Sequence, residues 1–598
     1  MTSARARVRA PELRGRGWLN TGGRAYSLSD WRGRFLLLDF WSFCCINCLH
    51  VLDELRPLEE KYADELVIVG VHSPKFVHEA DPDALAAAVG RYRVEHPVLD
   101  DPELLTWQAY TARAWPTLVL VDPEGYIVGQ YAGEGHAHAI DALLTGLREQ
   151  HLATGTLQPG ESPYVPPPVH AGNLEFPAKA VLLPGGTFLV ADAGHHSLVE
   201  LEADARTVVR RIGSGERGLT DGAAGVARFN EPNGLCLLPV EVGREVGHDV
   251  VVADTVNHAL RGVRLDDGSV RTLAGNGHQL FPGSPTADGS LSSPWDVAWW
   301  QDRVWVAMAG IHQLWTFDPR TGSAEAAGGT GNEGLLDGSL AEAWFAQTSG
   351  FAAAGDRLWI ADSETSSVRF VEDGSVHTVV GTGLFDFGFT DGPADAALLQ
   401  HPLGVTLLPD GSVAVCDTYN GAVRRIADGV VTTLATGLAE PSGAVVQGDD
   451  LVVVESAAHR LTRVPLGAVA AADGFAHRTQ RPVTEIAAGD VEIVVEFTPP
   501  PGQEVDDRFG PPSQLLVSAT PTGLLRGGDG RGTELRRVVT LDATVGAGVL
   551  HIAARAASCD VDSGEGAACH LHQQDWGVPV RVTDDGLAVL VLPLSGRS

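Results

Sequence analysis

Three cysteines that lie close together, Cys44, Cys45 and Cys48, are the residues of this sequence best suited to covalent chemistry. They follow the apolar run 36–38 and precede a predicted helix. The amides at the start of a helix favour an anion, so a strand that leads into Cys45-x-x-Cys48 is an arrangement that activates a thiolate. The same spacing also fits half of a zinc site, which would need a second pair of ligands from elsewhere in the chain. His50 alone is a poor supplement.

The segments around these cysteines alternate between strand and helix patterns. Residues 36–40 and 66–71 are apolar runs typical of buried parallel strands, and the helix at 48–62 lies between them. Four further elements are predicted: a helix at 83–92, strands at 117–121 and 126–131, and a helix at 140–151. A βαβ unit followed by an αββα arrangement therefore predicts an α/β domain over residues 1–155.

The length and charge of the chain limit its class. A chain of 598 residues exceeds what one hydrophobic core usually organises, so we expect about three domains. Its 70 glycines against 2 methionines favour turn-rich β structure. The formal net charge of −33 disfavours nucleic acid and anionic membranes as partners.

The N-terminal residues bear on location. The basic run from Arg5 to Arg16 has no apolar segment after it, and no stretch of about 18 apolar residues occurs anywhere. We therefore expect a cytoplasmic protein. In a reducing compartment a C-x-x-C motif is more often redox-active or metal-binding than a structural disulfide.

The residues of the first domain resemble the thioredoxin fold, closest to the thiol-disulfide oxidoreductases. Asp39-Phe40-Trp41 followed by Cys45-x-x-Cys48 matches the thioredoxin pattern, and Trp115-Pro116-Thr117 matches the cis-proline loop of that family. The resemblance implies that Cys45 attacks a disulfide and that Cys48 resolves the mixed disulfide. It also implies a cis Pro116 beside the dithiol, and Trp41 as part of the same site.

Asp39 and Cys44 are the two members of this site whose roles stay open. Asp39 resembles the buried proton-transfer group of the family, which would accept the Cys48 proton, and the alternative is a surface or turn carboxylate. Cys44 stands where thioredoxins have an aromatic residue, and Ile46-Asn47 replaces their Gly-Pro. It either offers Cys48 an alternative disulfide or packs beside Trp41 as an inert small residue.

The middle of the chain, after a Pro-rich linker at 156–169, repeats itself over 170–467. A motif such as Ala253-Asp254-Thr255-Val256-Asn257 follows an apolar strand in four clear and two weaker copies. A second landmark precedes each copy, and its Pro-x-Gly form is clearest at Pro232-Asn233-Gly234 and Pro402-Leu403-Gly404. The interval of about 40 to 60 residues is the repeat length of four-stranded propeller blades, so we predict six blades. These repeats resemble NHL repeats. The recurring Asp is expected to cap a turn and not to bind metal.

The tail, residues 480–598, alternates apolar and polar residues at 491–497, 549–557 and 587–594, which predicts a small antiparallel β-sandwich. Cys559 and Cys569 fit a disulfide, a metal site or two unrelated thiols. For a cytoplasmic chain we prefer unrelated or weakly paired thiols. Cys236 and Cys416 lie in predicted propeller strands and are expected to be core residues.

The order of thioredoxin-like domain, NHL propeller and C-terminal β domain, with its Cys44-Cys45-Ile46-Asn47-Cys48 segment, resembles the NHL repeat-containing protein 2 family. We expect a thiol-disulfide oxidoreductase that acts on a protein or peptide thiol or disulfide, with the propeller and tail as its docking platform and with no cofactor. The alternative is a non-enzymatic protein-interaction scaffold. A zinc site of Cys44, Cys45, Cys48 and His50 ranks lowest, because adjacent cysteines strain one tetrahedral site.

Overall fold

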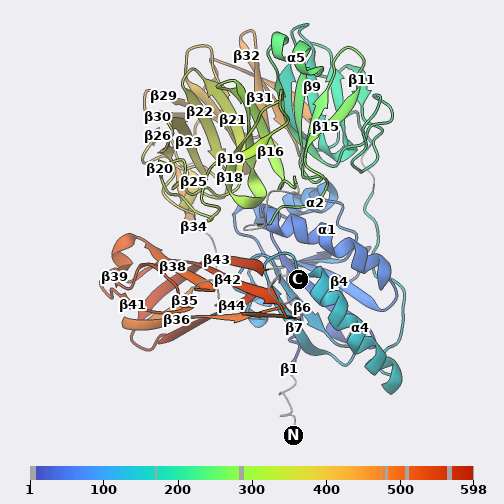
Figure 1. The fold of residues 1–598 in the computed structure, drawn as a ribbon, viewed down its shortest axis with the longest axis vertical. Helices are drawn as coiled ribbons and strands as arrows, with labels where there is room; N and C mark the ends of the chain where they lie inside the picture. Colours follow the sequence, from blue (N-terminus) through green and yellow to red (C-terminus); the bar gives the residue numbers. More distant parts are fainter. Residues whose placement is uncertain are drawn as a thin grey trace. The chain divides into compact units, whose positions relative to one another are not determined.

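The computed structural model describes residues 8–168, 171–281, 289–384, 386–472, 474–478, 483–500, 502–505, 511–561 and 569–596. The chain forms two compact units (Figure 1). Unit 1 comprises residues 1–168, 282–284 and 480–598, and unit 2 comprises residues 169–281 and 285–479. Arg5 and Arg7 of the basic N-terminal run lie outside the described residues.

The N-terminal part of unit 1 is built on one seven-stranded sheet of order β1-β7-β6-β3-β4-β5-β2. Its strands are β1 (Val8–Arg9), β2 (Gly17–Leu19), β3 (Phe35–Trp41), β4 (Leu66–His72), β5 (Val98–Asp100), β6 (Thr117–Val121) and β7 (Tyr126–Ala132). Its helices are η1 (Leu28–Trp31), α1 (Ile46–Lys61), η2 (His78–Ala80), α2 (Pro82–Arg91), α3 (Leu105–Ala109) and α4 (Ala137–Thr154).

Strands β3 and β4 lie next to each other in the middle of this sheet. Every residue of both is buried, which is why they read as continuous apolar runs, and they pair in parallel with α1 as the connection. The predicted βαβ unit is confirmed. Strands β1, β2 and β5 and helix α3 were not predicted, because segments of two to five residues are too short to show a period.

The C-terminal part of unit 1 contains two sheets. The first has the order β35-β43-β42-β38-β40, with β37 on β42, and the second has the order β39-β41-β36-β44. Their bounds are β35 (Thr484–Ala487), β36 (Gly489–Thr498), β37 (Gln503–Val505), β38 (Ser513–Thr520), β39 (Leu525–Gly527), β40 (Gly530–Gly532), β41 (Arg536–Leu541), β42 (Ala547–Asp560), β43 (Cys569–Thr583) and β44 (Val589–Ser595), with η7 (Thr522–Leu524) between β38 and β39. Buried side chains of both sheets, such as Ile493 and Ile552, belong to one core.

The predicted antiparallel pairing of this region is wrong at two places. β35 pairs with β43 and β36 pairs with β44 in parallel. Strands this far apart in the sequence are joined by long connections, which permit parallel pairing, whereas a short hairpin permits only the antiparallel kind.

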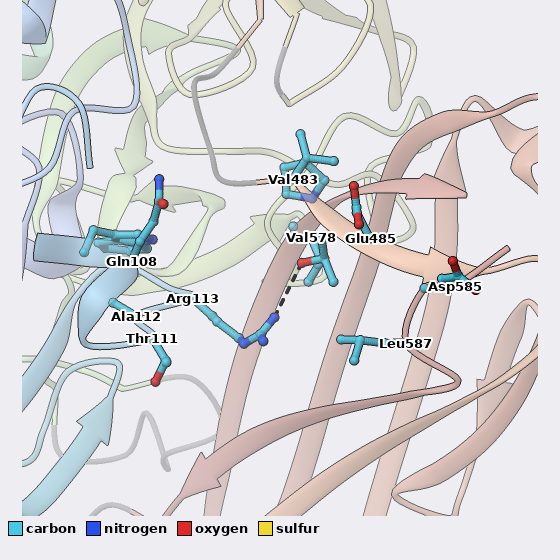
Figure 2. Close-up of a pocket in the computed structure, with 14 residues that line it drawn as sticks. Gln108, Thr111, Ala112, Arg113, Val483, Glu485, Val578, Asp585 and Leu587 are labelled. Carbon is cyan, nitrogen blue, oxygen red and sulfur yellow. Dashed lines mark hydrogen bonds between the residues drawn. The ribbon is translucent and has the colours of Figure 1, made fainter. Parts of the chain in front are cut away.

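The two parts of unit 1 meet at the loop after α3. Ala114 belongs to the core of the C-terminal sheets, and the Arg113 guanidinium donates to the Thr484 hydroxyl at 3.5 Å. Beside this contact lies a pocket of about 550 Å³ (Figure 2). Apolar side chains line it, including those of Trp107 and Val578, and Arg113, Glu485 and Asp585 bring charge to it.

Unit 2 consists mainly of six successive antiparallel sheets, here called sheets I to VI. Sheets I to III have four strands each: β8 (Pro177–Leu182), β9 (Phe188–Asp192), β10 (Ser197–Leu201) and β11 (Val208–Ile212); β12 (Pro232–Leu237), β13 (Val250–Asp254), β14 (Ala259–Val263) and β15 (Val270–Ala274); β16 (Pro294–Trp300), β17 (Arg303–Met308), β18 (Gln313–Phe317) and β19 (Ala324–Gly328).

Sheets IV and V have five strands each and sheet VI has three: β21 (Thr348–Ala354), β22 (Arg357–Asp362), β23 (Ser367–Glu372), β24 (Ser375–Val380) and β20 (Gly338–Ser339); β27 (Gly404–Leu407), β28 (Val413–Asp417), β29 (Ala422–Ala427), β30 (Val430–Ala435) and β26 (Gly392–Pro393); β31 (Pro441–Gln447), β32 (Asp450–Glu455) and β33 (Arg460–Pro465). A separate pair is formed by β25 (Asp386–Phe389) and β34 (Phe475–Arg478), and the helices are α5 (Val240–Val246), η3 (Ala193–His195), η5 (Ala309–Ile311) and η6 (Thr418–Asn420).

The first long strands of the six sheets contact one another in a closed cycle, β8, β12, β16, β21, β27, β31 and back to β8. The Ser442 hydroxyl of β31 donates to the Ala178 carbonyl of β8 at 2.5 Å, which joins the last sheet to the first. This arrangement is propeller-like.

The Pro-x-Gly landmark lies where these strands crowd together. A Cβ at Gly234, Gly350 or Gly404 would come within 3.0 Å of a neighbouring strand, so glycine permits the close approach. Two sheets depart from the landmark, with Lys179 and Asp296 at the glycine position. These two side chains bind each other at 2.8 Å, so one departure compensates for the other.

The recurring acidic residue of the repeats binds backbone, as predicted, but its partner is a distant N–H and not one in the adjoining turn. Asp254, Asp362 and Asp417 each accept a backbone N–H from the segment that begins the same sheet, at 2.8, 2.9 and 2.7 Å. In the eroded copy, the Met308 sulfur accepts the equivalent N–H of Ser292 at 3.3 Å. In each of these four sheets the same hydrogen bond therefore links the end of the second long strand to the segment that begins the sheet.

The remaining cysteines behave in two ways. Cys236 and Cys416 are buried thiols, as expected. Cys559 is disulfide-bonded, so the preference for unrelated or weakly paired thiols is wrong for this residue. The register of β42 and β43 places Cys569 directly opposite Cys559, whereas the side chain of Cys569 lies outside the described residues. That cross-strand proximity was not visible in the sequence.

Candidate active site: the dithiol at the start of α1

Cys45 and Cys48 lie together at the first turn of α1. Cys45 is the N-cap residue, and the Cys48 backbone N–H donates to the Cys45 carbonyl at 3.0 Å. Both are thiols, and their side chains are hydrogen-bonded to each other. Burial raises the pKa of Cys48 well above its ordinary value, and the hydrogen bond with Cys45 raises it further. The inner thiol therefore needs a proton acceptor before it can react.

The proline loop faces the outer thiol. The Trp115–Pro116 peptide bond is cis, as predicted, and the Cys45 sulfur lies 4.0 Å from the Trp115 carbonyl oxygen. The Trp115 ring stacks on Trp107, with the ring centroids 4.0 Å apart. Trp107 also lines the pocket of Figure 2, so one aromatic pair connects the pocket wall with the loop beside Cys45.

Asp39 is in the interior and not on the surface. It sits within β3 with 0% exposure, and among the described residues neither carboxylate oxygen has a hydrogen-bond partner. Burial raises its pKa well above 3.8, with smaller contributions from Glu54 and Glu59. Its charge in turn raises the pKa of Cys48. Asp39 and Cys48 are therefore suited to exchange a proton.

Trp41 ends β3 directly ahead of the cysteine loop and is fully buried. Its ring packs edge-on against His72, with centroids 5.4 Å apart, and Gly70 leaves the room that its indole needs. Burial lowers the pKa of His72 to about 3, so this imidazole is neutral at pH 7. Trp41 therefore contributes a buried, closely packed ring next to the cysteine loop.

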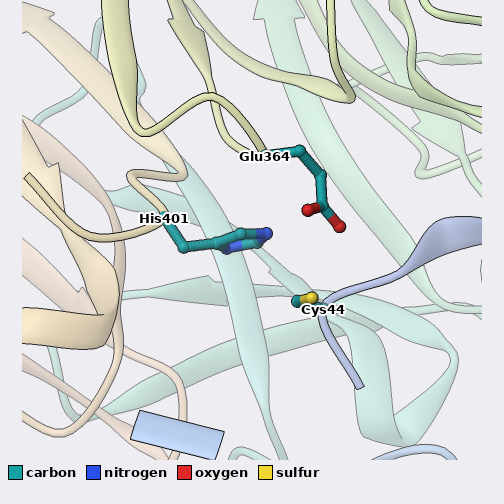
Figure 3. A group of neighbouring side chains, drawn as sticks. All are labelled: Cys44, Glu364 and His401. Atoms are coloured by element: carbon teal, nitrogen blue, oxygen red, sulfur yellow. The ribbon is translucent and has the colours of Figure 1, made fainter. Parts of the chain in front are cut away.

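Cys44 has a hydrogen-bond partner, Ser42, that is not part of the dithiol. It stands on the loop before α1 (Figure 3). Its sulfur lies 3.1 Å from the Ser42 hydroxyl oxygen. The Ser42 hydroxyl donates to the buried Glu79 carboxylate at 2.7 Å, so the thiol of Cys44 is the donor to Ser42. A thiol that donates in this way is stabilised in its protonated form. The other side chains drawn there, Glu364 and His401, belong to unit 2.

The zinc alternative does not gather its ligands. Within the described ranges, no three of Cys44, Cys45, Cys48 and His50 bring their ligand atoms within 4.8 Å of one another. The His50 ring nitrogen Nδ1 instead lies 2.5 Å from the Glu134 carboxylate, and both side chains are buried. His50 lies within α1, and its side chain is engaged by Glu134.

The structure adds residues that the sequence analysis missed. Lys75 and Glu79 come from the segment after β4 and are buried beside the dithiol loop. The Glu79 carboxylate accepts the Cys44 backbone N–H at 3.0 Å. A lysine and a glutamate four residues apart after a strand look like an ordinary surface loop, so only their burial identifies them.

Comparisons with known proteins agree with this architecture. A family model described as thioredoxin-like matches residues 33–127, and an NHL repeat model matches residues 399–426. Chicken NHL repeat-containing protein 2 is 34% identical over 471 residues, which are 71% of this chain and 63% of that protein. Over this span the chain is similar to the NHL repeat-containing protein 2 family.

Other relatives match different shares of the chain. The chloroplastic protein SUPPRESSOR OF QUENCHING 1 of Arabidopsis thaliana is 35% identical over 73% of this chain, which spans 43% of that protein. The chain thus spans less than two thirds of either relative's length. The thiol-disulfide oxidoreductase YkuV of Bacillus subtilis is 26% identical over 21% of this chain and 82% of its own length. None of the described helices is long and apolar enough to cross a membrane.

Proposed function

We propose that this chain is a thiol-disulfide oxidoreductase that acts on protein or peptide thiols and disulfides. The observation that carries the proposal is the combination at one site of two hydrogen-bonded thiols and a buried carboxylate without a hydrogen-bond partner among the described residues. Burying a carboxylate without hydrogen-bond donors costs free energy, and such a group is typical of a proton-transfer site. The cis peptide carbonyl of Trp115 beside Cys45 supports the same assignment.

The reaction proceeds by two displacements. The Cys45 thiolate attacks one sulfur of a substrate disulfide, forms a Cys45–substrate disulfide bond and releases the other substrate sulfur as a thiolate. Cys48 then loses its proton to Asp39, and its thiolate attacks the Cys45 sulfur. The Cys45–Cys48 disulfide forms, and the second substrate sulfur leaves as a thiolate. The substrate gains two electrons that the dithiol loses, and the reverse sequence oxidises a substrate dithiol.

The rest of the molecule is assigned to substrate docking. We propose that sheets I to VI are six blades of a propeller that binds a protein partner, and that the two C-terminal sheets form a sandwich. The pocket lined by Trp107 and the C-terminal sheets offers that sandwich a place to contact an extended substrate. Nucleic acid and membranes are not expected partners, given the net charge of −33.

The cytoplasmic location stays part of the proposal and is open to test. A disulfide at Cys559 is more typical of oxidising compartments. Cell fractionation with a tagged full-length protein decides between the cytoplasm and an oxidising compartment.

The experiment measures thiol reactivity and disulfide exchange together. Each cysteine is alkylated with iodoacetamide across a pH series and quantified by mass spectrometry, and reduction of a disulfide-linked peptide pair is followed. We expect Cys45 to react well below the ordinary thiol pKa of about 8.5, and Cys45→Ser to abolish exchange. Cys236→Ser, which removes a buried thiol of unit 2, is the matched control and should keep the exchange rate.

Trapping identifies the substrate and tests the alternative. Cys48→Ser should leave Cys45 joined to its substrate by a disulfide, and Cys45→Ser/Cys48→Ser should capture nothing. If Cys45 alkylates only at the ordinary pH and Cys48→Ser traps no partner, the oxidoreductase proposal is wrong and the non-enzymatic scaffold is favoured.

A further inference from the structure

Lys75 brings a positive charge into the interior next to the dithiol. It lies three residues beyond β4 and is buried, although lysine rarely is unless its charge is compensated. Its ammonium nitrogen stands 5.7 Å from the centre of the Trp115 ring. The carbonyl of the same Trp115 faces the Cys45 sulfur, so one residue contacts both the lysine and the outer cysteine.

Glu79 fixes the backbone that carries Lys75. One carboxylate oxygen accepts the N–H groups of Lys75 and Phe76 at 2.8 and 3.0 Å. The other accepts the Ser42 hydroxyl and the Cys44 N–H at 2.7 and 3.0 Å. A single buried carboxylate therefore ties the lysine segment to the loop that begins the cysteine motif.

A second bond holds the same segment against the proline loop. The Trp115 indole N–H donates to the Ser73 carbonyl at 2.7 Å. Lys75 is thus restrained from two sides, by Glu79 and by Trp115. A fixed charge of this kind needs no reorganisation when a negative charge develops beside it.

The charges around Cys48 oppose one another. Burial, the bond to Cys45 and the charge of Asp39 raise the pKa of Cys48, whereas the charge of Lys75 lowers it. Lys75 is the one group among these that favours the thiolate, which is the form that must attack in the resolving step.

We propose that Lys75 stabilises the Cys48 thiolate when the mixed disulfide is resolved, and that Glu79 is the positioning residue that holds Lys75 there. This inference rests on the proposed oxidoreductase function. As Cys48 gives its proton to Asp39, one negative charge passes to sulfur, and the charge of the buried Lys75 favours that anion. The charge is consumed when the Cys48–Cys45 bond forms and the leaving thiolate departs.

The test separates the two displacements in one reaction. The full-length reduced protein is mixed with 5,5′-dithiobis(2-nitrobenzoate), an aromatic disulfide. One coloured thiolate is released when Cys45 attacks, and a second when Cys48 resolves the mixed disulfide. Both phases are followed from pH 5 to 10 in the wild type, Lys75→Met, Lys75→Arg and Glu79→Gln, with Lys61→Met, a surface lysine, as the control.

We expect Lys75→Met to slow the second phase about tenfold at pH 7 and to move its pH midpoint up by about one unit, because the loss of an opposite charge near a thiol has an effect of that size. The first phase should change less. Lys75→Arg should stay within about twofold of the wild type, Glu79→Gln should lie between, and Lys61→Met should be unchanged. If Lys75→Met does not fold, Lys75→Gln replaces it in the same assay.

The possible outcomes distinguish a failure of the Lys75 inference from a failure of the proposed oxidoreductase function. If the wild type shows two phases and the second phase of Lys75→Met has the wild-type midpoint, Lys75 is only structural and the inference is overturned, whatever the change in stability. If the wild type shows no phase dependent on Cys45, the oxidoreductase proposal fails and the inference fails with it.

Discussion

Two kinds of buried aspartate, one in each unit, show how the same residue type serves different purposes. Asp254 of unit 2 is entirely buried and binds the Asn230 N–H, the Asn257 amide and the Arg261 guanidinium, each at 2.8 Å. Asp39 of unit 1 is equally buried and has no hydrogen-bond partner among the described residues.

The difference lies in what each environment provides. Burial raises the pKa of Asp254 to about 6, and Arg261 and the hydrogen bonds oppose that rise. For Asp39 the neighbouring charges, Glu54 and Glu59, add to the rise. A buried carboxylate with a full set of donors stabilises a fold, whereas one surrounded by apolar groups and like charges is suited to hold a proton.

The largest effect is expected when the satisfied aspartate loses its charge. Asp254→Asn leaves Arg261, which has 0% side-chain exposure, without its buried counter-ion. We expect the free energy of unfolding of unit 2 to fall by roughly 3–5 kcal/mol, measured by urea denaturation. Asp221→Asn is the control, because Asp221 pairs with the same arginine but is 51% exposed, and it should cost at most about 1 kcal/mol. Equal losses in both variants would remove the contrast.

A second effect concerns the ion pair of Lys179 and Asp296. The Lys179 ammonium also donates to the carbonyls of Ser349 and Leu403, at 2.7 and 2.9 Å. Lys179→Gly or Asp296→Gly alone leaves a buried charge without its partner, whereas the double variant restores the glycine that other sheets carry. We expect a coupling energy of about 2–3 kcal/mol in a double-mutant cycle of unfolding free energies. Additive losses would mean that the two departures are independent.

The smallest effect has the opposite sign. Asp39→Asn should raise the free energy of unfolding at pH 7 by about 1–3 kcal/mol, because it removes a buried charge without a hydrogen-bond partner in the described residues. It should also slow the resolving step of disulfide exchange, in which Asp39 accepts the proton. A variant that is less stable than the wild type at pH 7 would show that Asp39 is a structural carboxylate like Asp254.

The pH dependence of that stability difference sharpens the comparison. The folded pKa of Asp39 lies above its ordinary 3.8, so its contribution to stability is fully present below pH 3.8 and is lost as the pH rises through the folded pKa. The advantage of Asp39→Asn over the wild type should therefore vanish in acid and grow toward neutral pH. Denaturation midpoints of the two proteins at pH 4 and pH 8 provide the measurement.

Features of this protein that rest on the local spacing of residues could be predicted from the amino-acid order alone. The runs at β3 and β4 and the Cys45-x-x-Cys48 motif were readable, because burial on both faces and a helix start each leave a local signature. The cis Pro116 followed only from the resemblance of Trp115-Pro116-Thr117 to a known loop, because an X-Pro bond permits the cis form without requiring it. The repeats of unit 2 were readable for the same reason as the strand runs, since an acidic residue recurs after an apolar strand in most of them.

Which charged side chains meet depends on the folded chain and could not be predicted from local spacing. The fold brought Lys75 and Glu79 to the dithiol, placed Lys179 against Asp296 across 117 residues, and set Cys559 opposite Cys569. It also removed every hydrogen-bond partner in the described chain from Asp39. Pairing and isolation depend on residues far apart in the sequence, and a buried charge has its energetic meaning only through the groups that the fold packs around it.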